Sequence, residues 1–97
     1  MTDDIGELTE AEFARALPRA LRRRLSRGEI RGGEDVRALR RFVGLSQARF
    51  ALALGISVHT LRNWEQGRRH PEGPALALLR IAARHPRVLH ENLVAAG

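Results

Sequence analysis

The stretch GISVHTLRNWEQGRR, residues 55–69, decides how this chain is interpreted. It opens with Gly55, and a left-handed turn costs little energy only at glycine. Read as a helix, the segment places Leu61 and Trp64 on one side. The opposite side then carries Val58, His59, Arg62 and Asn63. A short helix that presents such hydrogen-bonding side chains to solvent is typical of a surface that reads another molecule.

Length and composition limit the class of protein. The chain has 97 residues, which predicts one domain with a small appended segment. It has no cysteine, so a disulfide frame and a thiolate metal site are excluded. Its apolar runs are far shorter than the ~20 residues that cross a bilayer, and its acidic start lacks the pattern of a secretory signal. We therefore expect a cytoplasmic protein with no membrane partner and no cofactor.

The charge of the chain is uneven. The formal net charge is +6, and every one of the 17 basic residues is arginine. Residues 1–30 hold as many acids as arginines, so the basic excess lies in residues 31–97, together with the opening stretch. Arginine binds phosphate and guanine well through its planar fork, although a biased genomic composition would also produce an all-arginine chain. The distribution favours a polyanionic partner.

Helical periodicity runs through almost the whole chain, and no segment alternates like a strand. Thr9 and Glu12 fit a capping box that starts a first helix, which Pro18 kinks or splits. Residues 31–33, RGG, are interpreted as a hinge. The sequence therefore predicts an all-α fold with a helical arm over 1–32 and a domain over 33–97. The helices expected in the domain span about 34–43, 46–54, 58–66, 74–84 and 87–94.

Two of these short helices, joined by the glycine turn, make a helix-turn-helix. The stretch 36–67 resembles the Xre family, to which lambda repressor and Cro belong. The continuation EQGRRHPEGPALALLRIAARHP is similar to HigA-type antitoxins of type II toxin–antitoxin modules. The resemblance implies a five-helix lambda-repressor-like domain that binds its own operator as a dimer. The positions that carry the family resemblance are Leu45, Ser46, Gln47, Ala51, Gly55, Ser57, Leu61, Trp64, Glu65 and Gly67.

The resemblance also implies which residues contact double-stranded DNA, with the helix over 58–66 in the major groove. Arg62 can pair with guanine, Asn63 with adenine, and Val58 can pack on a thymine methyl. The alternative is that these are solvated surface residues. The predicted base-reading residues are Val58, His59, Thr60, Arg62 and Asn63. The predicted phosphate contacts are Ser46, Gln47, Ser57, Arg68 and Arg69.

Two further roles follow from the resemblance. An arginine of the helix over 34–43, Arg40, is expected to form a partly buried, structural ion pair with Glu65, next to a core Trp64. Gln47 is expected to hold the first residue of the recognition helix, here Val58. Valine departs from the family pattern at this position, because it cannot form the usual side-chain bridge.

A palindromic operator requires a dimer, since one short helix reads few base pairs. We predict that the last two helices supply a two-fold interface. The alternative is that the last helix only covers the core. The predicted interface residues are Val88, Leu89, Leu93 and Val94.

The arm carries an apolar stripe at helical spacing that could dock on a toxin groove. The six arginines of the predicted first helix fit poorly to the basic ribonucleases that such toxins tend to be, whereas the acidic residues at the start of the chain suit them better. The alternative is that the arm packs back on the domain or on the dimer mate. The predicted toxin contacts are Phe13, Leu17, Leu21 and Leu25.

The predicted function is therefore a sequence-specific transcriptional repressor, and an antitoxin that represses its own operon and neutralises a toxin. A stand-alone Xre-family or phage-type regulator is the main alternative, and a protein-interaction module without DNA binding is a remote one. An enzyme is not expected, because none of the four histidines has a carboxylate or a nucleophile at a spacing typical of a catalytic site. No metal site is expected for the same reason.

Overall fold

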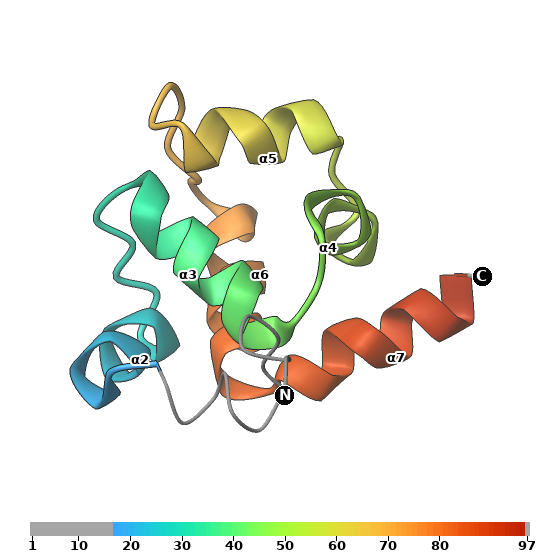
Figure 1. The fold of residues 1–97 in the computed structure, drawn as a ribbon, viewed down its shortest axis with the longest axis horizontal. Coiled ribbons are helices and arrows are strands. Elements are labelled where there is room, and N and C mark those ends of the chain that lie inside the picture. Colours follow the sequence, from blue (N-terminus) through green and yellow to red (C-terminus); the bar gives the residue numbers. More distant parts are fainter. Residues whose placement is uncertain (1–16, 97) are drawn as a thin grey trace, which may run out of the picture.

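The computed structural model describes residues 17–96, with side chains described as far as residue 93, and this part of the chain is helical without strands (Figure 1). The predicted all-helical class, with five helices after an N-terminal helical segment, is confirmed. The last helix begins at Pro86 rather than Arg87, because proline is tolerated at a first helical position. The helices of this described part are α2 (Arg19–Ser26), α3 (Gly33–Val43), α4 (Gln47–Leu54), α5 (Val58–Glu65), α6 (Pro74–Arg84) and α7 (Pro86–Ala96). None of these helices is long and apolar enough to cross a bilayer.

The helix-turn-helix consists of α4 and α5, and each helix has a serine N-cap. The Ser46 hydroxyl accepts a hydrogen bond from the Arg49 amide at 3.2 Å, and the Ser57 hydroxyl accepts one from the Thr60 amide at 3.0 Å. Gly55 ends α4 with a φ of 77°, in the left-handed region where side chains are disfavoured. The serine caps therefore favour the starts of both helices, and the glycine favours the end of α4, through local contacts alone.

A single apolar cluster joins the described helices. Phe50 of α4, Leu61 of α5 and Leu79 of α6 are each completely buried. Such a cluster is needed because helices as short as α4 and α5 are marginal alone. The remaining buried apolar residues include Leu25, Ile30, Val36, Leu39, Phe42, Val43, Leu45, Ala51, Ala53, Leu54, Trp64, Ala82, Ala83, Leu89 and Leu93.

The segment predicted to be a hinge is instead part of the packed structure. Gly33 is the first residue of α3, and a methyl group added to it would lie 2.3 Å from the Glu65 carbonyl oxygen. Glycine is required here because the backbone of α3 lies directly against the end of α5. Gly32, one residue earlier, has open space around it.

Helix α2 packs on the domain, mainly against α6. This part of the predicted arm therefore packs back on the domain, which is the alternative to docking on a toxin. Leu25 is completely buried, so it is not available as the predicted toxin contact. Leu17 and Leu21 are half-buried against the same core, and Phe13 lies outside the described residues. Arg24 fixes the helix further, because its guanidinium donates to the Asp35 carboxylate of α3 at 2.7 Å.

Helix α7 covers the core, and this corrects the predicted dimer face. Leu89 and Leu93 are buried within the chain, whereas Val88 is 43% exposed. The side chain of Val94 lies outside the described part. Asn92 donates to the Ala53 carbonyl oxygen at 2.7 Å, so α7 is also tied to α4 by a polar contact. Leu89 and Leu93 face inward because they lie one helical turn apart on the side that meets α4 and α6.

Candidate nucleic-acid interface

Helix α5 has one buried and one open side. Leu61 and Trp64 face the core, whereas His59 and Arg62 are exposed. Val58 is half-buried and packs against the core. In Figure 1, α5 lies along the upper edge of the molecule, with α2 and α7 at the lower edge. A helix in this position can enter a groove of DNA without displacing another helix.

The polar residues of α5 differ in how freely their side chains can contact a base. Thr60 is half-buried, and its hydroxyl accepts a hydrogen bond from the Ser57 hydroxyl at 3.0 Å. The Asn63 side chain is half-buried, and the backbone carbonyl oxygen of Asn63 accepts from the backbone amides of Arg68 and Arg69 at 2.9 and 3.3 Å. This backbone contact turns the chain sharply after α5 and places both arginines beside its end. Of the predicted base-reading residues, His59 and Arg62 project furthest into solvent.

A basic cleft lies at the end of α5. Arg68 and Arg69 line it together with Arg31, His70 and other residues, around a cavity of about 280 Å³. The three arginines are exposed, and none of them forms a salt bridge with another side chain of residues 17–93. Arg31 is not among the phosphate contacts predicted from the sequence, because it precedes Arg68 by 37 positions and no local pattern links the two residues. The cleft matches a phosphate-binding surface in charge and in its position beside α5.

Glu65 forms the buried ion pair with Arg40 beneath this surface. The Arg40 Nε atom donates to Glu65 Oε2 at 2.7 Å, and Arg40 Nη2 donates to Oε1 at 3.3 Å. The Glu65 side chain is only 1% exposed, and Arg37 lies on its outer side at 3.7 Å. Arg40 Nη1 also donates to the Leu45 carbonyl oxygen at 3.1 Å, so the pair holds the loop before α4 as well.

The Glu65 carboxyl group remains ionised despite its burial. Burial by itself raises its pKa, but hydrogen bonds from Arg40 and Gln47 and the positive charges of Arg40 and Arg37 outweigh this effect. The net pKa of Glu65 is therefore below the usual glutamate range. An ionised carboxylate can only accept hydrogen bonds, which fixes the direction of every contact around it.

Gln47, the first residue of α4, connects this ion pair to the open side of α5. Its Nε2 atom donates to Glu65 Oε1 at 3.0 Å, and its Oε1 atom accepts from Arg62 Nε at 3.3 Å. The resemblance had implied a link between Gln47 and Val58 instead. The structure places Arg62 at the end of the link, because valine offers no polar atom.

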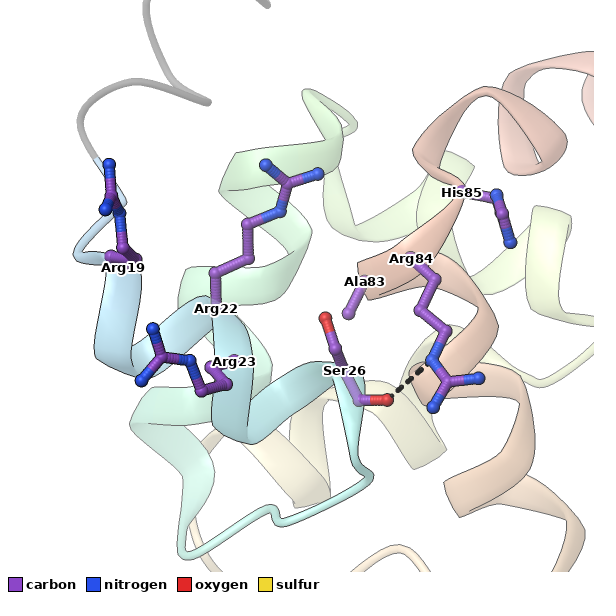
Figure 2. A pocket seen from close by; sticks show the side chains of 7 residues that line it. All are labelled: Arg19, Arg22, Arg23, Ser26, Ala83, Arg84 and His85. Atoms are coloured by element: carbon purple, nitrogen blue, oxygen red, sulfur yellow. Dashed lines mark hydrogen bonds between the residues drawn. The ribbon is translucent and has the colours of Figure 1, made fainter.

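A second group of arginines lies between α2 and the end of α6, around a cavity of about 480 Å³ (Figure 2). Arg84 extends from α6 and donates to the Ser26 carbonyl oxygen at 2.8 Å. Arg22 extends towards α3, where its guanidinium lies 4.8 Å from the centre of the Phe42 ring. Arg19 and Arg23 complete the cationic lining. This group lies on the opposite side of the molecule from α5, so it belongs to a different surface.

Within residues 17–96, no group of histidine and carboxylate residues is arranged to hold a metal ion.

Comparisons with known proteins agree with this geometry. A family model described as a helix-turn-helix domain matches residues 33–93. Antitoxin HigA-2 of Vibrio cholerae serotype O1 is 41% identical over 56 residues, which cover 58% of this chain and 54% of that protein. The chain thus spans about half the length of the curated relative it matches, and no solved structure matches it significantly. Because the family model covers most of the chain, including all of α3–α6, this chain belongs to the helix-turn-helix family of DNA-binding domains.

Proposed function

We propose that this chain is a sequence-specific transcriptional repressor in which α5 reads bases in the major groove. The observation that carries the proposal is the open side of α5, which adjoins the capped start of α4 through Gln47 and Arg62 and the basic cleft of Arg31, Arg68 and Arg69 at its end. A reading helix flanked by phosphate-binding groups is how helix-turn-helix proteins dock on DNA.

Base reading is assigned to the residues predicted from the sequence. Arg62 donates to guanine, Asn63 pairs with adenine, and Val58 contacts a thymine methyl with its exposed portion. His59 offers a donor or acceptor beside them. The hydroxyl of Thr60 already takes part in the cap with Ser57, so Thr60 contributes its methyl group or a contact to the DNA backbone.

Phosphate binding is assigned to two places. At the starts of α4 and α5, the backbone N–H groups beside Ser46, Gln47 and Ser57 lie at the positive end of each helix dipole, which attracts an anion. Beyond the end of α5, Arg68 and Arg69 bind the DNA backbone together with Arg31. These contacts position the protein and do not by themselves read sequence.

We expect the repressor to act as a homodimer on a palindromic operator, whose half-sites are separated by about 34–36 Å. The exposed apolar residues of the last two helices support an interface that keeps Val88 of the predicted set and adds two residues of α6. Leu78 and Ile81 of α6 and Val88 of α7 are 37%, 41% and 43% exposed, and they line one groove of about 450 Å³. A second copy of the chain is the proposed occupant, because a two-fold axis brings the same apolar side chains face to face.

The similarity to antitoxin HigA-2 supports a more specific role, in which the chain represses its own operon and neutralises a toxin. Copurification with the product of the adjacent reading frame tests this role. Retention of that protein at high salt supports an antitoxin, whereas a toxin-like neighbour that never copurifies supports a stand-alone regulator.

The test of DNA reading compares Arg62→Ala with Arg68→Ala in fluorescence-anisotropy titrations. Labelled duplexes are first selected from a randomised library with the wild-type chain, and each base pair is then varied. Arg62→Ala should lose about 1–3 kcal/mol of discrimination at one position of each half-site. Arg68→Ala should weaken all duplexes alike and lower the salt dependence of binding.

The same titrations distinguish a DNA reader from a module that only binds protein. A repressor with six to ten phosphate contacts should lose roughly 10³–10⁵ in affinity between about 50 and 200 mM salt. Absence of any selected sequence, together with equal effects of the two variants on all duplexes, would contradict base reading by α5.

A further inference from the structure

We propose that Gln47 is a positioning residue for the base-reading Arg62, a role that rests on the proposed function of α5. Gln47 contacts Glu65 with one end of its amide and Arg62 with the other. It thereby transmits the geometry of a buried ion pair to an exposed side chain on the DNA-reading surface.

The inner end of this link is rigid. Glu65 is buried and accepts two hydrogen bonds from Arg40, which in turn donates to the Leu45 carbonyl oxygen. The carboxylate cannot donate, so the nitrogen of the Gln47 amide must face it and the oxygen must face outward. The ionised state of Glu65 thus decides which atom Gln47 presents to Arg62.

The outer end of the link limits how Arg62 can approach a base. Its Nε–H group is held by the Gln47 oxygen at 3.3 Å, which leaves the N–H groups of Nη1 and Nη2 for DNA. Arg62 is therefore directed to meet guanine end-on, through its two terminal nitrogens. A long, exposed side chain gains specificity when its conformation is fixed before binding, since less conformational freedom is then lost in the complex.

This role differs from a phosphate contact in what its loss would change. A lost phosphate contact weakens binding to all sequences alike, whereas a lost positioning contact weakens the preference at the base pair that Arg62 reads. It also differs from a purely structural role, because the Arg40–Glu65 pair persists without Gln47. Gln47→Met retains the length and the helical propensity of the side chain but removes both hydrogen bonds.

The first measurement needs no DNA. In ¹⁵N relaxation spectra of the arginine side chains, wild-type Arg62 Nε should be more ordered than Arg68 Nε, and Gln47→Met should abolish the difference. Gln47→Asn, which is too short to bridge both partners, should act in the same way if Gln47→Met fails to fold. Equal mobility of Arg62 Nε in the wild type and in both variants would overturn the proposal whether or not the protein binds DNA.

The second measurement is a double-mutant cycle on the selected wild-type duplex and its single base-pair variants. Gln47→Met should reduce discrimination at the Arg62 position about three- to tenfold, the value of a typical net hydrogen bond. In an Arg62→Lys background, which lacks the Nε–H group, Gln47→Met should change that discrimination by less than about twofold. Arg49→Ala, an exposed change on the same helix, is the control. A Gln47→Met variant that keeps the full wild-type discrimination at the Arg62 position, even if it binds all duplexes more weakly as after loss of a phosphate contact, would overturn positioning and leave base reading by α5 intact.

Discussion

Glu65 is a buried residue that contacts both Arg40 in α3 and Gln47 at the start of α4. Its carboxylate lies between Arg40 on the inside and Gln47 on the outside, at 2.7 and 3.0 Å. A buried charge that loses its partner is costly, whereas removal of both charges is far less so. Partners at positions 40 and 65 could be expected from the resemblance alone. The contact of Gln47 with Arg62 could not, because it depends on the direction of three side chains from two helices.

Arg40→Met should therefore destabilise the fold by about 3–5 kcal/mol near neutral pH, since it leaves Glu65 buried without its main partner. Arg40→Met/Glu65→Gln should recover a large part of that loss. Urea denaturation followed by circular dichroism measures both values. Arg27→Met, which breaks an exposed pair with Glu29, is the control and should cost less than about 1 kcal/mol. A double variant less stable than Arg40→Met would contradict the pairing.

Acid should remove this contribution in the direction set by the pKa of Glu65. That pKa is lower in the folded than in the unfolded chain, so the ionised carboxylate stabilises the fold above the usual glutamate value of 4.5. The contribution is lost as the pH falls through the lower folded value. Urea titrations repeated at decreasing pH measure the difference in free energy of unfolding between wild type and Glu65→Gln. This difference should become smaller as the pH falls below the usual glutamate pKa of 4.5. A gap that stays constant with pH would show that Glu65 does not titrate in this way.

At the scale of the elements, the contact between α3 and α5 is decided by the absence of one side chain. A methyl group on Gly33 would lie 2.3 Å from the Glu65 carbonyl oxygen and 2.7 Å from that of Trp64. Both neighbours are backbone atoms, which cannot rotate away. In the sequence, the two adjacent glycines Gly32 and Gly33 cannot be told apart. Only the packing of α3 against α5 shows that Gly33 is the one that has no room for a side chain.

Gly33→Ala should cost about 1–3 kcal/mol from overpacking, even though alanine favours a helix by about 1 kcal/mol. Gly32→Ala is the matched control, because Gly32 has an extended φ of −177° and no atom within contact distance. Its effect on the free energy of unfolding should stay within about 0.5 kcal/mol. Thermal or urea denaturation of the two variants compares them directly. Equal destabilisation by both substitutions would mean that α3 and α5 are not in close contact.

At the scale of the whole molecule, three surfaces are distinguished. In our proposal, the open side of α5 reads DNA and the apolar groove of Leu78, Ile81 and Val88 joins two copies. The arginine group of α2 and α6 lies away from α5 (Figures 1 and 2). The dimer face was the least predictable of the three. In the sequence, Leu89 and Leu93 are as suited to a dimer interface as Val88, but both are buried in the core of the single chain.

Ile81→Glu should therefore raise the dissociation constant of the dimer by at least about tenfold, because it places a charge in the apolar groove. Analytical ultracentrifugation over a range of concentrations measures this change. Ala20→Glu adds the same charge on exposed α2 and should leave the dimer unaffected. A wild-type chain that remains monomeric with and without operator DNA would end the proposal of this interface.

The sequence by itself determined the helical class, the capped ends and glycine turn of the helix-turn-helix, and the uneven positive charge. These properties are local, because they follow from residue type and from spacing along one helix. Only the tertiary structure decided that Leu25, Leu89 and Leu93 are buried and that Arg31 joins Arg68 at one cleft. Apolar side chains suited to a core and to an interface have the same chemistry, so the packing of distant segments determines which of them remain exposed.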